Sequence, residues 1–275
     1  MTNVNSTDIR WVHGVDFSGA KDAGRKIWIT TGLIRGKELL IKDCRSAKEL
    51  LGSETDLRRC LHALIDFVSG QREAIFGMDF PFGRPAAHIE QKTWEKFVSS
   101  FRKRFPDPDR FKRICFEKGN CRELKRVTDK EQGTPFSPYN LRLFKQTYYG
   151  IGYIIEPLLR EGQACFLPME EPLAGKPWVI EICPAVTLKK EGLHFSYKGK
   201  TSECCNQRLM ILKKLVEIGN LRISPHLENK ILNNHGGDAL DSVIAALATF
   251  RNLPNLLTPL EMGNSSYNLE GYVYV

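Results

Sequence analysis

The succession of short apolar segments in the N-terminal third most limits what this chain can fold into. Three segments, residues 9–18, 25–36 and 37–44, follow one another with glycines between them, which favours an antiparallel meander of strands. Residues 53–70 then change to the apolar spacing of an amphipathic helix. Residues 73–79 predict a fourth strand. This order of three strands, a helix and a strand predicts an α/β protein with a mixed sheet.

Strands and helices also alternate in the C-terminal part of the chain, and a segment of different character precedes them. Residues 177–185 predict another strand, and residues 201–219 predict a helix. Residues 235–252 predict a last helix, which begins near Asp238. Residues at about 85–165 instead mix aromatic and basic residues at helical spacing, interrupted by prolines and glycines. We therefore expect residues 1–275 to form one α/β domain that carries a basic helical insertion at about 85–165.

Positive charge is concentrated in that insertion. The chain has 40 Lys and Arg against 32 Asp and Glu, a formal net charge of +8. Residues 84–145 contain 16 Lys and Arg against 8 Asp and Glu, so their excess of 16 − 8 = 8 equals that of the whole chain. A local excess of this kind indicates a polyanionic partner.

The composition predicts a reduced compartment and no membrane insertion. The 8 cysteines form no Cys-x-x-Cys pair, which favours reduced, mostly structural thiols. No apolar run approaches the roughly 20 residues that span a bilayer. The first ten residues are polar and lack the apolar core of a signal peptide. We expect a cytoplasmic location.

Four carboxylates occupy positions where they can converge. Asp16 and Asp79 each end a predicted strand, while Asp238 and Asp241 lie in the first turn of the last helix. Residues three apart on a helix differ by about 60° around its axis, so both can face one point. If that helix packs across the two strand ends, the carboxylates repel one another unless a cation is bound. Oxygen ligands of this kind suit Mg²⁺ or Mn²⁺.

Four sequence fragments carry a resemblance to a known group of proteins. They are GVDFSGA at residues 14–20, GMDFPFG at 77–83, EICPA at 181–185 and HGGDALDSVIAAL at 235–247. Their content and order resemble the ribonuclease H-like superfamily, with acidic residues arranged as in Holliday-junction resolvases of the RuvC type. More narrowly, they resemble the domain-of-unknown-function family 429 of predicted nucleases. The resemblance implies a ribonuclease H-like sheet, in which an antiparallel three-strand meander is followed by parallel strands and flanked by helices.

The same resemblance implies phosphodiester hydrolysis with two Mg²⁺ or Mn²⁺ ions about 4 Å apart. Asp16 would bridge both ions, Asp79 would hold one, and Asp238 with Asp241 would hold the other. The implied partner is nucleic acid, and a junction substrate would require a homodimer. The basic side chains expected to contact its phosphates are Arg102, Lys103, Arg104, Arg110, Lys112 and Arg113.

Three of the four carboxylates also have a simpler interpretation. Asp16 and Asp79 can belong to ordinary turns, and Asp238 can be stabilised by the helix dipole. Glu181, inside a predicted strand, needs a partner because an unpaired buried carboxylate is costly. It is therefore a catalytic candidate as a further metal ligand or a substrate contact, or else it is the partner of a buried arginine.

Two other functions fit part of the sequence. Actin-like ATPases and sugar kinases also begin with a Gly-x-Asp strand, and the turn DFSGAKDAG at residues 16–24 can bind a nucleotide phosphate. Their second glycine-rich phosphate turn is not evident, because residues 79–83 contain a proline instead. The other alternative is a nucleic-acid-binding protein of the same fold without catalytic activity.

Overall fold

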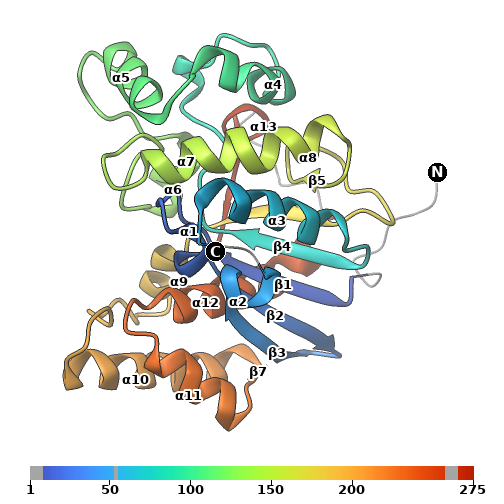
Figure 1. Ribbon diagram of the computed structural model, residues 1–275, viewed down its shortest axis with the longest axis vertical. Helices are drawn as coiled ribbons and strands as arrows, with labels where there is room; N and C mark the ends of the chain where they lie inside the picture. Colours follow the sequence, from blue (N-terminus) through green and yellow to red (C-terminus); the bar gives the residue numbers. More distant parts are fainter. Residues whose placement is uncertain (1–8, 53–54, 258–265) are drawn as a thin grey trace.

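A computed structural model describes residues 9–52, 55–257 and 266–275 and arranges them around one eight-stranded sheet (Figure 1). The strand order is β5-β6-β4-β1-β2-β3-β7, and β8 also pairs with β6. The strands are β1 (Trp11–Asp16), β2 (Trp28–Arg35), β3 (Glu38–Ser46), β4 (Ala74–Met78), β5 (Cys165–Phe166), β6 (Trp178–Ile182), β7 (Leu221–Arg222) and β8 (Val273–Tyr274).

The strand directions confirm the predicted mixed sheet. β1, β2 and β3 form the antiparallel meander, and β4 pairs with β1 in parallel on the other side. β6 continues the parallel part beside β4. Within the described part of the chain, no helix has the length and apolarity needed to cross a membrane.

Helices cover both faces of the sheet. Figure 1 shows α3, α7 and α8 on one side of the sheet and α10, α11 and α12 on the other. The helices are α1 (Ala23–Lys26), α2 (Ala47–Leu51), α3 (Leu57–Ser69), η2 (Ala86–His88), α4 (Trp94–Arg104), α5 (Pro108–Lys118), α6 (Val127–Gln132), α7 (Phe144–Gly150), η3 (Ile151–Ile155), α8 (Glu156–Arg160), α9 (Pro184–Lys190), α10 (Ser202–Gly219), α11 (Pro225–Asn233), α12 (Asp238–Asn252), η4 (Leu253–Asn255) and α13 (Tyr267–Glu270).

Helix α12 packs directly against the first strand. A Cβ added to Gly14 of β1 would lie 2.1 Å from the carbonyl oxygen of Ser242 and 2.2 Å from the nitrogen of Ala246. Only glycine permits this approach, because any side chain would push the helix away from the sheet. The glycine of the Gly-x-Asp motif therefore sets how closely α12 packs against β1.

The insertion forms an aromatic layer over the opposite face of the sheet. Phe97 and Phe101 of α4 and Phe111 of α5 are fully buried in the core that also contains β1 and β4 side chains. Within the insertion, residues 144–160 form a continuous helical run made of α7, a π-helical segment at Ile151–Ile155, and α8. Gly150 of this run packs against the ring of Phe80. A Cβ added to Gly150 would lie 2.3 Å from a ring carbon, so no side chain fits there. Gly150 therefore allows close packing and does not end the helix.

Candidate metal centre

Two of the predicted carboxylates lie at one edge of the sheet. Asp16 is the last residue of β1, and Asp79 follows the last residue of β4. The two strands are parallel neighbours, and the backbone N–H of Asp79 donates to the carbonyl of Val15 at 3.0 Å. Since adjacent parallel strands end on the same side of the sheet, both carboxylates emerge at the same edge.

The first turn of α12 brings the other two carboxylates to this edge. Asp238 is the first residue of the helix, preceded by Gly237 with φ at +83°, and Asp241 lies one turn further on. Asp241 is buried, at 4% exposure, on the helix that packs over β1. We refer to Asp16, Asp79, Asp238 and Asp241 as the carboxylate cluster.

The charges of the cluster act strongly on one another. Burial raises the pKa of Asp16 well above its ordinary value, and the charges of Asp241, Asp79 and Asp238 raise it further. Burial and the charge of Asp241 likewise raise the pKa of Asp79 to about 8. The charges of all three other members therefore act on Asp16.

A lysine and a tyrosine hold Asp241 in place. The Nζ of Lys198 lies 2.6 Å from Oδ2 of Asp241, and the hydroxyl of Tyr197 donates to Oδ1. The positive charge of Lys198 also lowers the pKa of Asp16, although burial and the neighbouring carboxylates outweigh it. Lys198 therefore partly neutralises the cluster. Burial raises the pKa of Asp238, and the charges of Lys26 and Lys198 both act to lower it.

The loop that carries these two residues is held by a buried arginine. Arg208 of α10 donates to the carbonyl of Tyr197 at 2.6 Å and to that of Gly199 at 2.9 Å. The sequence alone did not point to Tyr197, Lys198 or Arg208. A signal existed for Arg208, since it shares the apolar stripe of α10 with Ile211 and Leu215 and is itself fully buried. A cation in such a stripe needs a buried partner. No comparable signal marked Lys198.

The donor set suits a hard cation, although the side chains do not form a finished ligand cage. Carboxylate oxygens are what Mg²⁺ and Mn²⁺ prefer, and raised pKa values indicate a site that gains by binding positive charge. In the described residues, no three His, Cys, Asp or Glu side chains are grouped so that they could hold one ion as they stand. Binding of an ion would therefore require rotamer changes, including release of Asp241 by Lys198.

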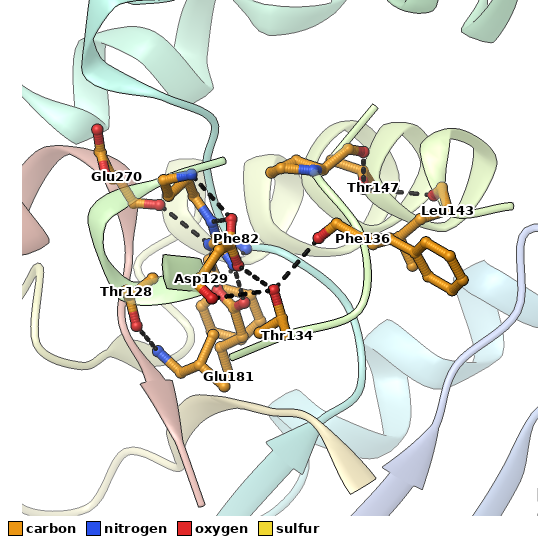
Figure 2. A network of polar contacts seen from close by, with 12 residues as sticks. Phe82, Thr128, Asp129, Thr134, Phe136, Leu143, Thr147, Glu181 and Glu270 are labelled. Atoms are coloured by element: carbon orange, nitrogen blue, oxygen red, sulfur yellow. Dashed lines mark hydrogen bonds and ion pairs between the residues drawn. The ribbon is translucent and has the colours of Figure 1, made fainter. Parts of the chain in front are cut away.

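Glu181 is placed outside the cluster. Both of its carboxylate oxygens accept from the guanidinium of Arg126, and Oε2 also accepts from the backbone N–H of Phe82 at 2.8 Å. Arg126 also binds Asp129, and all of these groups are buried. Figure 2 shows Glu181 and Asp129 side by side, with Glu270 approaching from the C-terminal segment. Of the interpretations given for Glu181, this geometry matches the partner of a buried arginine.

The basic side chains of the insertion lie away from the cluster, and none of them contacts it. Figure 1 shows α7 and α8 between the sheet and helices α4 and α5, which carry all six residues. Lys103 and Arg110 are exposed. The other four form ion pairs: Arg102 with Glu156, Arg104 with Glu90, Lys112 with Asp109, and Arg113 with Glu117. Glu156 is buried, whereas the pairs of Arg104, Lys112 and Arg113 lie at the surface and remain open to exchange with a phosphate.

Replacing Lys198 by Met should strengthen Mg²⁺ binding about three- to tenfold. The side chain is 55% exposed, so solvent limits the effect to that of a surface ion pair. The substitution removes a competing cation from Asp241 and makes the cluster more negative. Isothermal titration with Mg²⁺ measures the change, and Lys200→Met, on the same loop, is the matched control. Weaker binding in Lys198→Met would show instead that the lysine organises the ligands.

The metal-free protein should lose stability as the pH rises. The pKa of Asp79 lies at about 8 in the folded chain, above its ordinary value of 3.8, so the folded state holds a proton that the unfolded state releases. Its contribution is complete below about pH 4 and declines by about 1.4 kcal/mol per pH unit until about pH 8. Thermal unfolding in a chelator should show a smaller decline for Asp79→Asn than for the wild type. Equal slopes would contradict this assignment.

Comparison with known proteins adds no relative to this picture. No family model, no curated protein and no solved structure matches the chain. The functional conclusion therefore depends on the arrangement of the chain's own residues.

Proposed function

We propose that this protein is a ribonuclease H-like nuclease that hydrolyses phosphodiester bonds of nucleic acid with Mg²⁺ or Mn²⁺. The observation that carries the proposal is the carboxylate cluster, in which two strand ends and one helix turn bring four acidic residues to a single edge. Burial and the neighbouring carboxylates raise the pKa of Asp16 and of Asp79, which is an electrostatic pattern typical of a cation site. The antiparallel meander followed by parallel strands supports the fold part of the proposal.

The residues have distinct roles in this proposal. Asp16 senses all three other carboxylates and would be the ligand shared by two ions. Asp79 would complete one ion site, and Asp238 with Asp241 the other. Two bound ions would supply an activated water and stabilisation of the leaving oxygen. Lys198 then becomes free to contact a phosphate of the substrate, because Asp241 no longer requires its charge.

The turn after β1 gives less support to the kinase alternative. A phosphate-binding turn must leave its backbone N–H groups open to the ligand. A Cβ added to Gly19 would lie 2.6 Å from the carbonyl oxygen of Lys145, so α7 covers this part of the turn. Gln146 of the same helix donates to the carbonyl of Phe17 at 2.6 Å. This packing leaves little space for a nucleotide phosphate and favours the nuclease.

The direct test is cleavage of labelled nucleic acids under controlled metal conditions. Single strands, duplexes, RNA–DNA hybrids and four-way junctions are each incubated with Mg²⁺, Mn²⁺ or a chelator. We expect cleavage of at least one substrate with Mg²⁺ or Mn²⁺ and none with the chelator. Cleavage that persists in the chelator, or no cleavage of any substrate with either metal, would refute the proposal. Protein of the Asp16→Asn variant, purified in the same way, reports contaminating nuclease.

A further inference from the structure

A cavity of about 180 Å³ opens beside Asp79. One side is formed by the chain that follows β4 and β6, including Phe80 and Cys183. The other side is formed by the segment from Thr134 to Gln146, which belongs to the insertion. The cavity thus joins the carboxylate cluster to the insertion, and whatever fills it lies next to the proposed reaction site.

Phe136 and Arg142 line the side of the cavity that belongs to the insertion. Phe136 is half-buried, and the guanidinium carbon of Arg142 lies 5.5 Å from the centre of its ring. Figure 2 shows Phe136 between Thr134 and Leu143, with its backbone carbonyl accepting from the hydroxyl of Thr134. Arg142 is exposed and forms no ion pair with any described residue. A planar group can stack on such a wall while the arginine contacts an attached phosphate.

The floor of the cavity excludes an anionic ligand. Arg126, Asp129 and Glu181 form it, and they are buried and saturated by their bonds to one another. One cation and two carboxylates leave a net negative charge there, which disfavours a phosphate or carboxylate. A neutral group is therefore the chemically suitable occupant of the inner part of the cavity.

One side chain offers a hydrogen-bonding edge to that occupant. The Nε2 of Gln146 donates to the carbonyls of Phe17 and Asp79, at 2.6 and 3.4 Å. These bonds fix the orientation of the carboxamide. The carboxamide oxygen remains able to accept from an amino or imino group in the cavity. The cavity therefore combines an apolar stacking wall with a positioned acceptor.

We infer that this cavity binds one unpaired nucleobase of the strand that is cleaved at the carboxylate cluster. The inference rests on the proposed function and narrows its substrate to nucleic acid with an unpaired or everted nucleotide at the scissile position. A base stacks on Phe136, its edge meets Gln146, and its phosphate lies between Arg142 and Asp79. A base pair does not fit the available volume, so an intact duplex must first release the base.

Binding of 2-aminopurine oligonucleotides tests this inference without cleavage. Ca²⁺ replaces Mg²⁺, and DNA and RNA probes carry the fluorescent base either fully paired or as a single unpaired nucleotide. For the wild type we expect quenching and about tenfold tighter binding of the unpaired probe. Phe136→Ala should weaken binding of the unpaired probe at least about fivefold, the contribution of one stacked base. Binding of the paired probe should stay within about twofold.

Two further variants separate a lost stacking contact from a general defect. Phe136→Tyr keeps the ring and should retain the preference for the unpaired probe. Leu141→Ala removes an exposed side chain, 68% accessible, from the same segment and should change nothing. Thermal unfolding of each variant shows whether it is folded. Loss of binding in Leu141→Ala as well would mean that the segment acts as a whole, which contradicts a base-specific contact.

The outcomes also distinguish this inference from the proposed function. One outcome is a preference for unpaired bases that depends on Phe136, with no cleavage in the presence of Mg²⁺ or Mn²⁺. This outcome would support base binding in the cavity and refute the proposed nuclease activity. The opposite outcome is metal-dependent cleavage with equal binding of both probes, unaffected by Phe136→Ala. This outcome would support the nuclease activity and refute base binding in the cavity. Free nucleosides bound as tightly as the oligonucleotides would overturn the claim that the occupant belongs to a strand.

Discussion

Replacing Asp16 by Asn is expected to reduce Mg²⁺-dependent cleavage by about 10³-fold or more. Asn keeps the shape of the side chain and removes its charge, and Asp16 is the carboxylate that senses Asp79, Asp238 and Asp241 together. A shared ligand affects both ions, so its loss removes charge stabilisation worth at least that of one preorganised contact. Initial rates at saturating Mg²⁺ measure the effect.

The same variant should be more stable than the wild type without metal. Burial and the neighbouring carboxylates make an ionised Asp16 costly, and the neutral amide avoids this cost. Thermal unfolding in a chelator at about pH 8 tests this difference. Asp66→Asn, on the exposed side of α3, is the matched control and should leave both rate and stability unchanged. A rate for Asp16→Asn above a tenth of the wild-type value would remove Asp16 from the proposed centre.

Replacing Arg126 by Met is expected to lower the free energy of unfolding by about 3–5 kcal/mol. Its guanidinium donates to Glu181, to Asp129 and to the backbone carbonyl of Glu270, and it is 1% exposed. Burial acts to lower the pKa of Arg126, but the charges of Asp129 and Glu181 outweigh burial and raise it well above its usual value. Without the arginine, two carboxylates stay buried and unpaired. Urea denaturation at neutral pH measures the loss.

A second substitution tests the cause of this destabilisation. Arg126→Met combined with Glu181→Gln removes one of the two uncompensated charges and should recover part of the lost stability. Arg113→Met, on the exposed face of α5, should change the free energy of unfolding by less than about 0.5 kcal/mol. A loss below about 1 kcal/mol in Arg126→Met would mean that water or a shifted side chain replaces the arginine.

Much of the sheet could be predicted because its information is local. Residues 9–46 contain three strand-length apolar segments with short connections, which permit little except a meander. The parallel strands β4 and β6 were predictable for the same reason, as buried apolar runs bounded by proline and glycine. Strands β5, β7 and β8 have two residues each, too few to show any periodicity. They pair only because neighbouring strands and helices bring them together.

The sequence by itself determined the four acidic positions of the carboxylate cluster. A carboxylate directly after a buried strand, or in the first turn of an apolar helix, is visible in the order of residues. Only the tertiary structure decided the partners of Lys198 and Arg126 and the position of the cavity beside Asp79. Lys198 meets Asp241 across 43 residues and Arg126 meets Glu181 across 55, and no local pattern records such a pairing. Such pairs form only when the chain folds, because an unpaired charge becomes unfavourable once the core excludes water from it.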